Sequence, residues 1–139
     1  MKVSLQRINS DYHFEAKGAS GIPVQIDNKV DGITHGSSPM ELLLMGVGGC
    51  SAIDVISILK KQRQEITSYD IEVIGERVDL KEARPFKAMH VVVKLAGDIA
   101  PQKAIRAAQL SFDKYCSVSI TLENVALTYE IILNDEKIK

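Results

Sequence analysis

The chain has 139 residues, of which 45% are hydrophobic and 25% are charged, a composition that excludes a disordered or collagen-like chain and fits one globular domain. Seventeen basic and eighteen acidic residues leave a net charge of −1, so no long-range field favours nucleic acid or an anionic membrane surface as a partner. We therefore expect a single domain over residues 1–139.

The N-terminal region predicts three short strands. Apolar and polar residues alternate over residues 2–8, 12–17 and 22–27, with the two-residue period of half-buried strands. Polar or glycine-containing turns separate these segments, so we expect an antiparallel meander, followed by a loop over residues 28–37. Charged residues interrupt the first eighteen positions, which therefore lack the apolar core of a signal peptide, and we expect a cytoplasmic protein.

A strong helix start follows this loop. Ser38 is typical of an N-cap, Pro39 suits the first helical position, and Glu41 completes a capping box with Ser38. The helix is predicted over residues 38–63, and apolar residues nearly encircle its first two thirds, as in a central buried helix. The longest nearly apolar run, residues 42–53, is too short to span a bilayer, so no membrane is expected.

The second half of the chain predicts two longer strands, a second helix and a last strand. The strands are expected over residues 69–78, 86–95 and 125–133, and the helices over residues 100–115 and 117–123. Strands and two principal helices in the order βββ-α-ββ-α-β indicate an α+β fold.

The chain contains only two cysteines, Cys50 and Cys116. In a reducing compartment such a pair is free, catalytic or redox-sensing more often than structural, although two inert buried thiols are the simpler alternative. Gly46, Gly48 and Gly49 precede Cys50, and each glycine costs a helix about 1 kcal/mol relative to alanine. Two explanations remain open: the glycines allow another element to pack closely, or they give a substrate access to the sulfur.

Two carboxylates lie on the same predicted helix as Cys50. Asp54 follows it by one turn on the same face, where it would raise the thiol pKa or accept a hydrogen bond, within the chain or across a dimer interface. Glu41 lies about half a turn out of phase with Cys50, so its carboxylate could reach a thiol only from a partner subunit; otherwise it serves the capping box.

Cys116 lies where one predicted helix ends and another begins. A helix N-terminus favours the thiolate, so Cys116 is predicted to ionise more readily than Cys50, which would need an external cation. The three histidines, His13, His35 and His90, do not have the spacing of metal ligands, and no phosphate-binding or dinucleotide-binding glycine motif is present. We expect neither a metal nor a cofactor.

Three segments resemble the OsmC/Ohr superfamily of thiol-dependent hydroperoxide reductases. They are SPMEL at residues 38–42, the small-residue run that ends at Gly49 and Cys50, and KYCSV at residues 114–118. The resemblance covers nearly the whole chain in element order and spacing. It implies an intertwined homodimer in which two long central helices are wrapped by antiparallel sheets, with two active sites at the interface.

The resemblance also implies roles for the two sulfurs. Cys50 would be the peroxidatic thiolate that reduces an organic hydroperoxide to an alcohol, and Cys116 would resolve the sulfenic acid as a disulfide. A dithiol reductant, either a lipoylated protein or a thioredoxin-like protein, would restore both thiols. The implied role is defence against oxidative stress.

The sequence departs from the superfamily pattern at two positions. Members pair the reactive cysteine with a glutamate and an arginine. This chain has Met40 at the position of that glutamate, one residue before Glu41. No arginine occurs between Asp11 and Arg63. Arg77 is a speculative substitute for that arginine, and a surface strand residue is its alternative role. These differences indicate a divergent branch, with slower peroxide reduction or another substrate.

The alternative function is a non-enzymatic dimer that binds a small apolar ligand or senses redox state.

Overall fold

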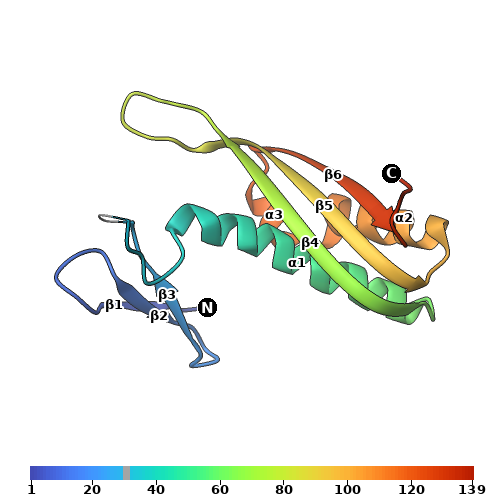
Figure 1. Cartoon of the computed structure of the whole chain (residues 1–139), viewed down its shortest axis with the longest axis horizontal. Helices are drawn as coiled ribbons and strands as arrows, with labels where there is room; N and C mark the ends of the chain where they lie inside the picture. Colours follow the sequence, from blue (N-terminus) through green and yellow to red (C-terminus); the bar gives the residue numbers. More distant parts are fainter. Residues whose placement is uncertain (30–31) are drawn as a thin grey trace. The chain divides into compact units, whose positions relative to one another are not determined.

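The computed structural model describes residues 1–29 and 32–139, and it divides into two compact units, residues 1–43 and 44–139. In chain order its elements are β1 (Ser4–Arg7), β2 (Phe14–Lys17), β3 (Pro23–Ile26), α1 (Pro39–Lys61), β4 (Glu65–Arg77), β5 (Phe86–Asp98), α2 (Pro101–Leu110), the π-helix η1 (Ser111–Tyr115), α3 (Ser117–Thr121), β6 (Ala126–Leu133) and β7 (Glu136–Lys137). Figure 1 shows these elements along the chain. The predicted α+β order is confirmed, with β7 and η1 as additions.

The first unit is the predicted antiparallel meander β1-β2-β3. Its last strand is joined to the segment before α1 by a bridge between Ile26 and Ser37. The carboxylate of the buried Asp27 accepts the amide of His35 at 2.9 Å, which ties the end of the predicted loop to β3. Residues 30 and 31 of that predicted loop lie outside the described residues.

The second unit is built on a four-stranded sheet in the order β4-β5-β6-β7. The sheet is antiparallel apart from one pair, because β5 and β6 run parallel, and this corrects the expectation of purely antiparallel sheets. A parallel pair needs a long crossover, and α2, η1 and α3 together supply it between β5 and β6.

The core of this unit joins one face of α1 to the sheet and to α2. Four side chains of β5 alternate into it with the two-residue period of a strand, and α1 contributes residues one or two turns apart. The buried members are Val47, Val55 and Leu59 of α1, Met89, Val91, Val93 and Leu95 of β5, Ile99 after β5, Ala104, Ala107 and Ala108 of α2, Phe112 of η1, and Ile131 and Leu133 of β6. The middle of α1 is therefore held firmly against the sheet.

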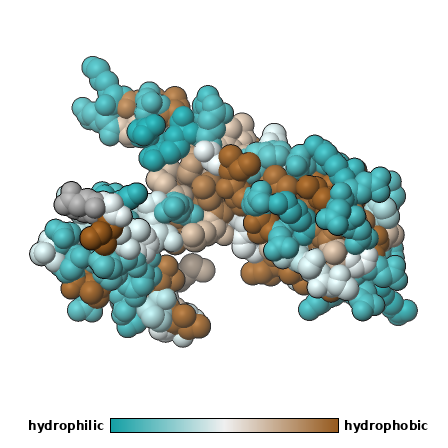
Figure 2. All heavy atoms as spheres, in the orientation of Figure 1, coloured by the Kyte–Doolittle hydropathy of each residue, from teal (hydrophilic) through white to brown (hydrophobic). Residues whose placement is uncertain are grey.

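The opposite face of α1 remains uncovered in the single chain. Met45 and Ile53, two turns apart on this helix, are 56% and 67% exposed, and Figure 2 shows brown and tan atoms over the middle of α1. Among the described residues, α1 alone is long and apolar enough to cross a membrane. Over 18 residues of this helix the mean hydropathy is 2.1, and 28% of that stretch is buried. The expectation that this segment is too short to span a bilayer is therefore wrong, because the whole helix stays apolar enough although Asp54 ends the run over residues 42–53. Core helices of soluble proteins meet the same criterion.

Gly97 marks an irregularity near the end of β5, and we expect Gly97→Ala to destabilise the fold. The backbone φ is +140°, which side chains rarely adopt, and an added Cβ would overlap the carbonyl oxygen of Glu65 on β4. The expected loss in the free energy of unfolding is about 2 kcal/mol or more, measured by urea denaturation at fixed protein concentration. Gly18→Ala is the control, because its Cβ would meet only Val3 Cγ1 at 3.8 Å. Equal midpoints for the two variants would contradict this prediction.

Candidate active site

The structure brings the two cysteines together. Cys50 lies half-buried on α1, and Cys116 lies fully buried between η1 and α3. Both are free thiols, and their Sγ atoms lie within 4.8 Å of each other. A disulfide requires an S–S distance of about 2.05 Å, so modest movement of one sulfur toward the other would close it.

The π-helix η1 determines where Cys116 lies. Its five residues continue α2 with a wider turn, and the amide of Cys116 donates to the carbonyl oxygen of Ser111 at 2.8 Å. The sequence predicted one regular helix over residues 100–115, so the π-turn corrects that expectation. Single π-turns inside helices occur frequently at functional sites, because they redirect the residues that follow.

Asp54 is the third member of the cluster. One of its carboxylate oxygens lies within 4.8 Å of both sulfurs, and the Ser111 hydroxyl donates to Asp54 Oδ2 at 3.1 Å. The prediction that Asp54 accepts a hydrogen bond is confirmed, and the donor belongs to the same chain. Ser111 therefore links the end of α2 to α1 at the level of the sulfurs.

The surroundings of Cys116 favour its neutral thiol. Burial raises the pKa of Cys116, and the neighbouring Cys50 raises it further. Ser119 acts in the opposite direction, because its hydroxyl donates to Cys116 Sγ at 3.0 Å and its amide also stabilises the thiolate. The expectation that the helix N-terminus favours the Cys116 thiolate is wrong, because loss of solvent raises its pKa by more than the donors of the five-residue α3 lower it.

This electrostatic arrangement predicts slow, pH-dependent alkylation of Cys116. In a Cys50→Ser variant, iodoacetamide modification of Cys116 is expected to increase only above about pH 8.5, the ordinary pKa of cysteine, because burial alone still raises its pKa. Ser119→Ala in that background should slow the reaction by up to about tenfold at a given pH, since a donor to the thiolate is lost. Mass spectrometry would follow both rates, and a Cys116 titration midpoint well below the ordinary value would refute the assignment.

The three glycines before Cys50 serve different purposes. A Cβ at Gly48 would lie 3.0 Å from Val73 Cγ2, so this glycine allows α1 to approach β4 closely. At Gly46 the nearest atom would be Val118 Cγ1 at an ordinary 3.6 Å, and at Gly49 an added Cβ would meet no described atom within 4 Å apart from its chain neighbours and the backbone of its own helix. Close packing therefore explains Gly48, whereas Gly49 leaves open space beside Cys50.

The other predicted site residues have local partners elsewhere. The amide of Ser38 donates to Glu41 Oε2 at 2.7 Å, the amide of Glu41 donates to Ser38 Oγ at 3.2 Å, and these contacts hold the pKa of Glu41 below its ordinary value. The predicted capping box is therefore confirmed. Arg77 lies at the end of β4, where its Nε donates to the carbonyl oxygen of Arg84 at 2.6 Å. Neither residue belongs to the Cys50–Asp54–Cys116 cluster.

The three histidines also lie outside the cluster. The rings of His13 and His35 stack at 5.2 Å within the first unit. His90 is a half-buried residue of β5, as expected for a sheet histidine, and its Nδ1 lies 2.7 Å from Thr128 Oγ1 on β6.

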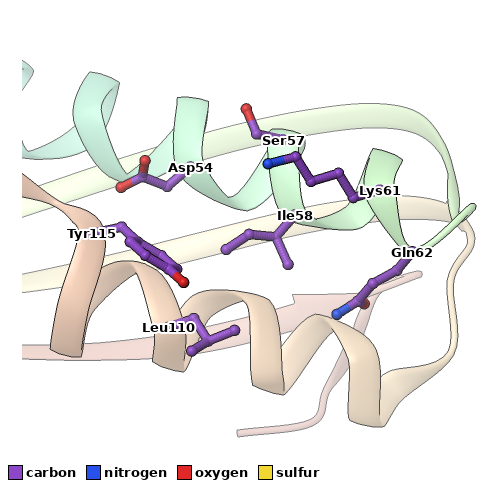
Figure 3. Close-up of a pocket in the computed structure, with 7 residues that line it drawn as sticks. All are labelled: Asp54, Ser57, Ile58, Lys61, Gln62, Leu110 and Tyr115. Atoms are coloured by element: carbon purple, nitrogen blue, oxygen red, sulfur yellow. The ribbon is translucent and has the colours of Figure 1, made fainter.

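A cavity of about 520 Å³ extends from the cluster along α1. Figure 3 shows Asp54 and Tyr115 at one end, Lys61 and Gln62 at the other, and the apolar side chains of Ile58 and Leu110 between them; Ser57 completes the lining. Asp54 belongs to both the cavity and the cluster, whereas neither cysteine lines the cavity, so Asp54 is the link between the two.

Sequence reasoning missed Ser111, Ser119 and the cavity. Ser119 follows the N-cap position of α3 by three residues, the spacing of a capping contact, and this signal could have identified it. Ser111 had no comparable signal, because its role depends on the packing of α2 against α1.

Comparison with known proteins agrees with this arrangement. The family described as OsmC-like protein matches residues 31–130. Protein YhfA of Escherichia coli K12 is 37% identical over 126 residues, which cover 86% of this chain and 90% of YhfA. A hypothetical protein from Aquifex aeolicus has a similar structure, with a TM-score of 0.80, 30% identity and 96% of each chain covered. An OsmC-like protein from Mycoplasma pneumoniae has a TM-score of 0.81 at 13% identity and 95% coverage of each chain, which shows likeness of fold alone. The chain belongs to the family of OsmC-like proteins.

Proposed function

We propose that this protein is a thiol peroxidase that reduces organic hydroperoxides through Cys50 and Cys116. The observation that carries the proposal is the proximity of a half-buried and a fully buried free thiol, with sulfurs within 4.8 Å. A peroxidatic thiol needs access to substrate, while a resolving thiol needs only to reach its partner. Cys50 and Cys116 match these two requirements, and Gly49 leaves room beside Cys50.

The proposed cycle has three steps. The Cys50 thiolate attacks the distal oxygen of the hydroperoxide, the O–O bond breaks, and the alkoxide takes a proton and leaves as the alcohol. The Cys116 sulfur then attacks the Cys50 sulfenic acid, forming a disulfide and releasing water. Finally, an external dithiol, from a lipoylated protein or a thioredoxin-like protein, gives two electrons and two protons through thiol–disulfide exchange and restores both thiols.

One solved structure of similar fold is named for organic hydroperoxide resistance. The organic hydroperoxide resistance protein OhrB of Bacillus subtilis has a TM-score of 0.62 to this chain, with 18% identity and coverage of 94% of this chain and 96% of OhrB. That likeness concerns the fold, so the activity of this chain rests on its own cysteine geometry. We place the protein in the cytoplasm, where the proposed role is defence against oxidative stress.

The uncovered face of α1 supports a homodimer. Met45, Gly49 and Ile53 recur at intervals of one turn and are all exposed, so they form a stripe along α1. A second copy of α1 could approach closely at Gly49, where an added Cβ would meet no described atom within 4 Å apart from its chain neighbours and the backbone of its own helix. A single domain over residues 1–139 is part of the proposal; α1 crosses the boundary between the two compact units. The capping carboxylate of Glu41 is the candidate that would reach the partner's thiol, and Arg77 is a speculative cation for the thiolate.

Steady-state turnover tests the peroxidase. The purified protein with dihydrolipoamide should consume cumene hydroperoxide and form the alcohol in equal amounts, without added metal or cofactor. Bovine serum albumin at matched thiol concentration controls for the uncatalysed reaction of free thiols. A rate no higher than that control would refute the proposal.

The cavity supports a second candidate function, the binding of a small amphipathic ligand without chemistry. Ile58 and Leu110 would contact its apolar part, and Lys61 and Gln62 would contact a polar end. The two candidates differ in the redox behaviour of the sulfurs. A protein that binds a ligand and forms no Cys50–Cys116 disulfide with mild hydroperoxide would be a binding protein.

A further inference from the structure

The Cys50–Asp54–Cys116 cluster has the donor set of a metal site. Two thiol sulfurs and one carboxylate oxygen all lie within 4.8 Å of one another. Zinc prefers thiolate, imidazole and carboxylate ligands, at about 2.3 Å for sulfur and about 2.0–2.2 Å for oxygen. Tetrahedral coordination at these lengths separates neighbouring ligand atoms by roughly 3.5–3.8 Å. Closing the cluster around one ion therefore requires movements of about an ångström.

The backbone that carries these donors is well anchored. Cys50 and Asp54 lie one turn apart on α1, beside Val47 and Val55, which are fully buried in the core. Cys116 follows η1, and its amide is bonded to the carbonyl oxygen of Ser111. Preorganised donors on packed elements lower the entropy lost when a metal is bound.

Two members of the cluster, Asp54 and Cys116, also accept hydrogen bonds from neighbouring serine hydroxyls. Ser111 donates to Asp54 Oδ2 and leaves the carboxylate further acceptor capacity for an ion. Ser119 donates to Cys116 Sγ at 3.0 Å and would stabilise a coordinated thiolate. Contacts of this kind orient metal ligands and tune their basicity.

No cationic side chain is bonded to the cluster within the described part of the chain. Lysine, arginine and histidine form neither a hydrogen bond nor an ion pair with Cys50, Asp54 or Cys116 there. Two thiolates and a carboxylate would leave three negative charges close together. A divalent cation would offset two of them, and Asp54 also lines the neighbouring cavity, so the carboxylate end of the cluster faces open space.

We propose that the reduced protein binds one Zn²⁺ per chain through Cys50, Cys116 and Asp54, with water in the fourth position. Binding releases the two thiol protons to solvent and occupies both sulfurs, so zinc would protect them from oxidation and the disulfide form would not bind it. Coordination itself does not depend on the peroxidase activity proposed above.

Metal binding by the reduced full-length protein tests this proposal. Titration with Zn²⁺ in competition with a chromophoric chelator should give one tight site per chain. Co²⁺ in place of Zn²⁺ should produce a thiolate-to-metal charge-transfer band and the visible bands of a tetrahedral site. We expect Cys50→Ser to abolish the charge-transfer intensity of one thiolate and to weaken Zn²⁺ binding by about 100-fold or more, and Ser111→Ala to weaken it by about 10-fold.

Two controls separate this site from non-specific binding. Asp54→Asn keeps the shape of the side chain and should weaken binding, whereas Asp113→Asn changes an exposed acid of η1 outside the cluster and should leave the affinity unchanged. Equal Zn²⁺ affinity for the wild type and Cys50→Ser, or equal affinity for the reduced and disulfide forms, would overturn the proposal. Hydroperoxide turnover in chelator-treated buffer measures the peroxidase activity without zinc. The zinc proposal and the peroxidase proposal can therefore fail independently.

Discussion

Replacement of Cys50 by serine is expected to lower hydroperoxide turnover by on the order of 10³-fold or more, because the attacking thiolate is lost. Serine is nearly isosteric with cysteine, and Cys50 is half-buried on a helix whose core contacts come from other residues, so the fold should be retained. Circular dichroism would check folding, and loss of cumene hydroperoxide with dihydrolipoamide would measure turnover.

Cys116→Ser is the matched variant, because it removes the other sulfur and keeps the proposed nucleophile. It should still release close to one equivalent of alcohol per chain in the first turnover, and it should stop at a Cys50 sulfenic acid that dimedone traps. If Cys50→Ser retained wild-type turnover, or if Cys116→Ser alone lost the first turnover while folded, the assignment of the two sulfurs would be wrong.

Replacement of Ile53 by aspartate is expected to separate the proposed dimer into monomers. Ile53 is 67% exposed in the single chain, so a charge at this position costs a monomer little. In a dimer formed through α1, the substitution would bury an unpaired carboxylate in each subunit, weakening association by about 3 kcal/mol or more, roughly 100-fold in Kd. Analytical ultracentrifugation over a range of concentrations would measure the shift.

The conservative variant Ile53→Leu controls for loss of the original side-chain shape. It should remain dimeric, because its volume and polarity are preserved. A wild-type protein that sediments as a monomer, or an Ile53→Asp variant with unchanged dimer affinity, would show that this face of α1 is not the interface between subunits.

Local sequence patterns predicted most elements of the fold. The alternation of apolar residues identified the strands, and Ser38, Pro39 and Glu41 identified the start of α1 within one residue. These signals succeed because the interactions that stabilise such elements lie within a few residues of one another. The pairing of β5 with β6 in a parallel register depends on the crossover through three helices, and no local pattern encodes it.

The sequence singled out the three residues that the structure brings together, and it also nominated two that lie elsewhere. The cysteine count drew attention to Cys50 and Cys116, and helical spacing added Asp54, whereas Glu41 and Arg77 lie outside the cluster. The pKa of Cys116 was predicted in the wrong direction, because burial is a property of the assembled core and outweighs the helix terminus. Ser111 reaches Asp54 across 57 residues of sequence, a contact that only the packing of α2 on α1 creates.

A single-turnover experiment shows directly whether Cys50 and Cys116 reduce a hydroperoxide together. The fully reduced protein would be mixed with one equivalent of cumene hydroperoxide per chain, quenched with an alkylating agent and digested for mass spectrometry. We expect one equivalent of alcohol and a disulfide between Cys50 and Cys116 within the same chain. Recovery of both cysteines as alkylated thiols, with the hydroperoxide unconsumed, would contradict it.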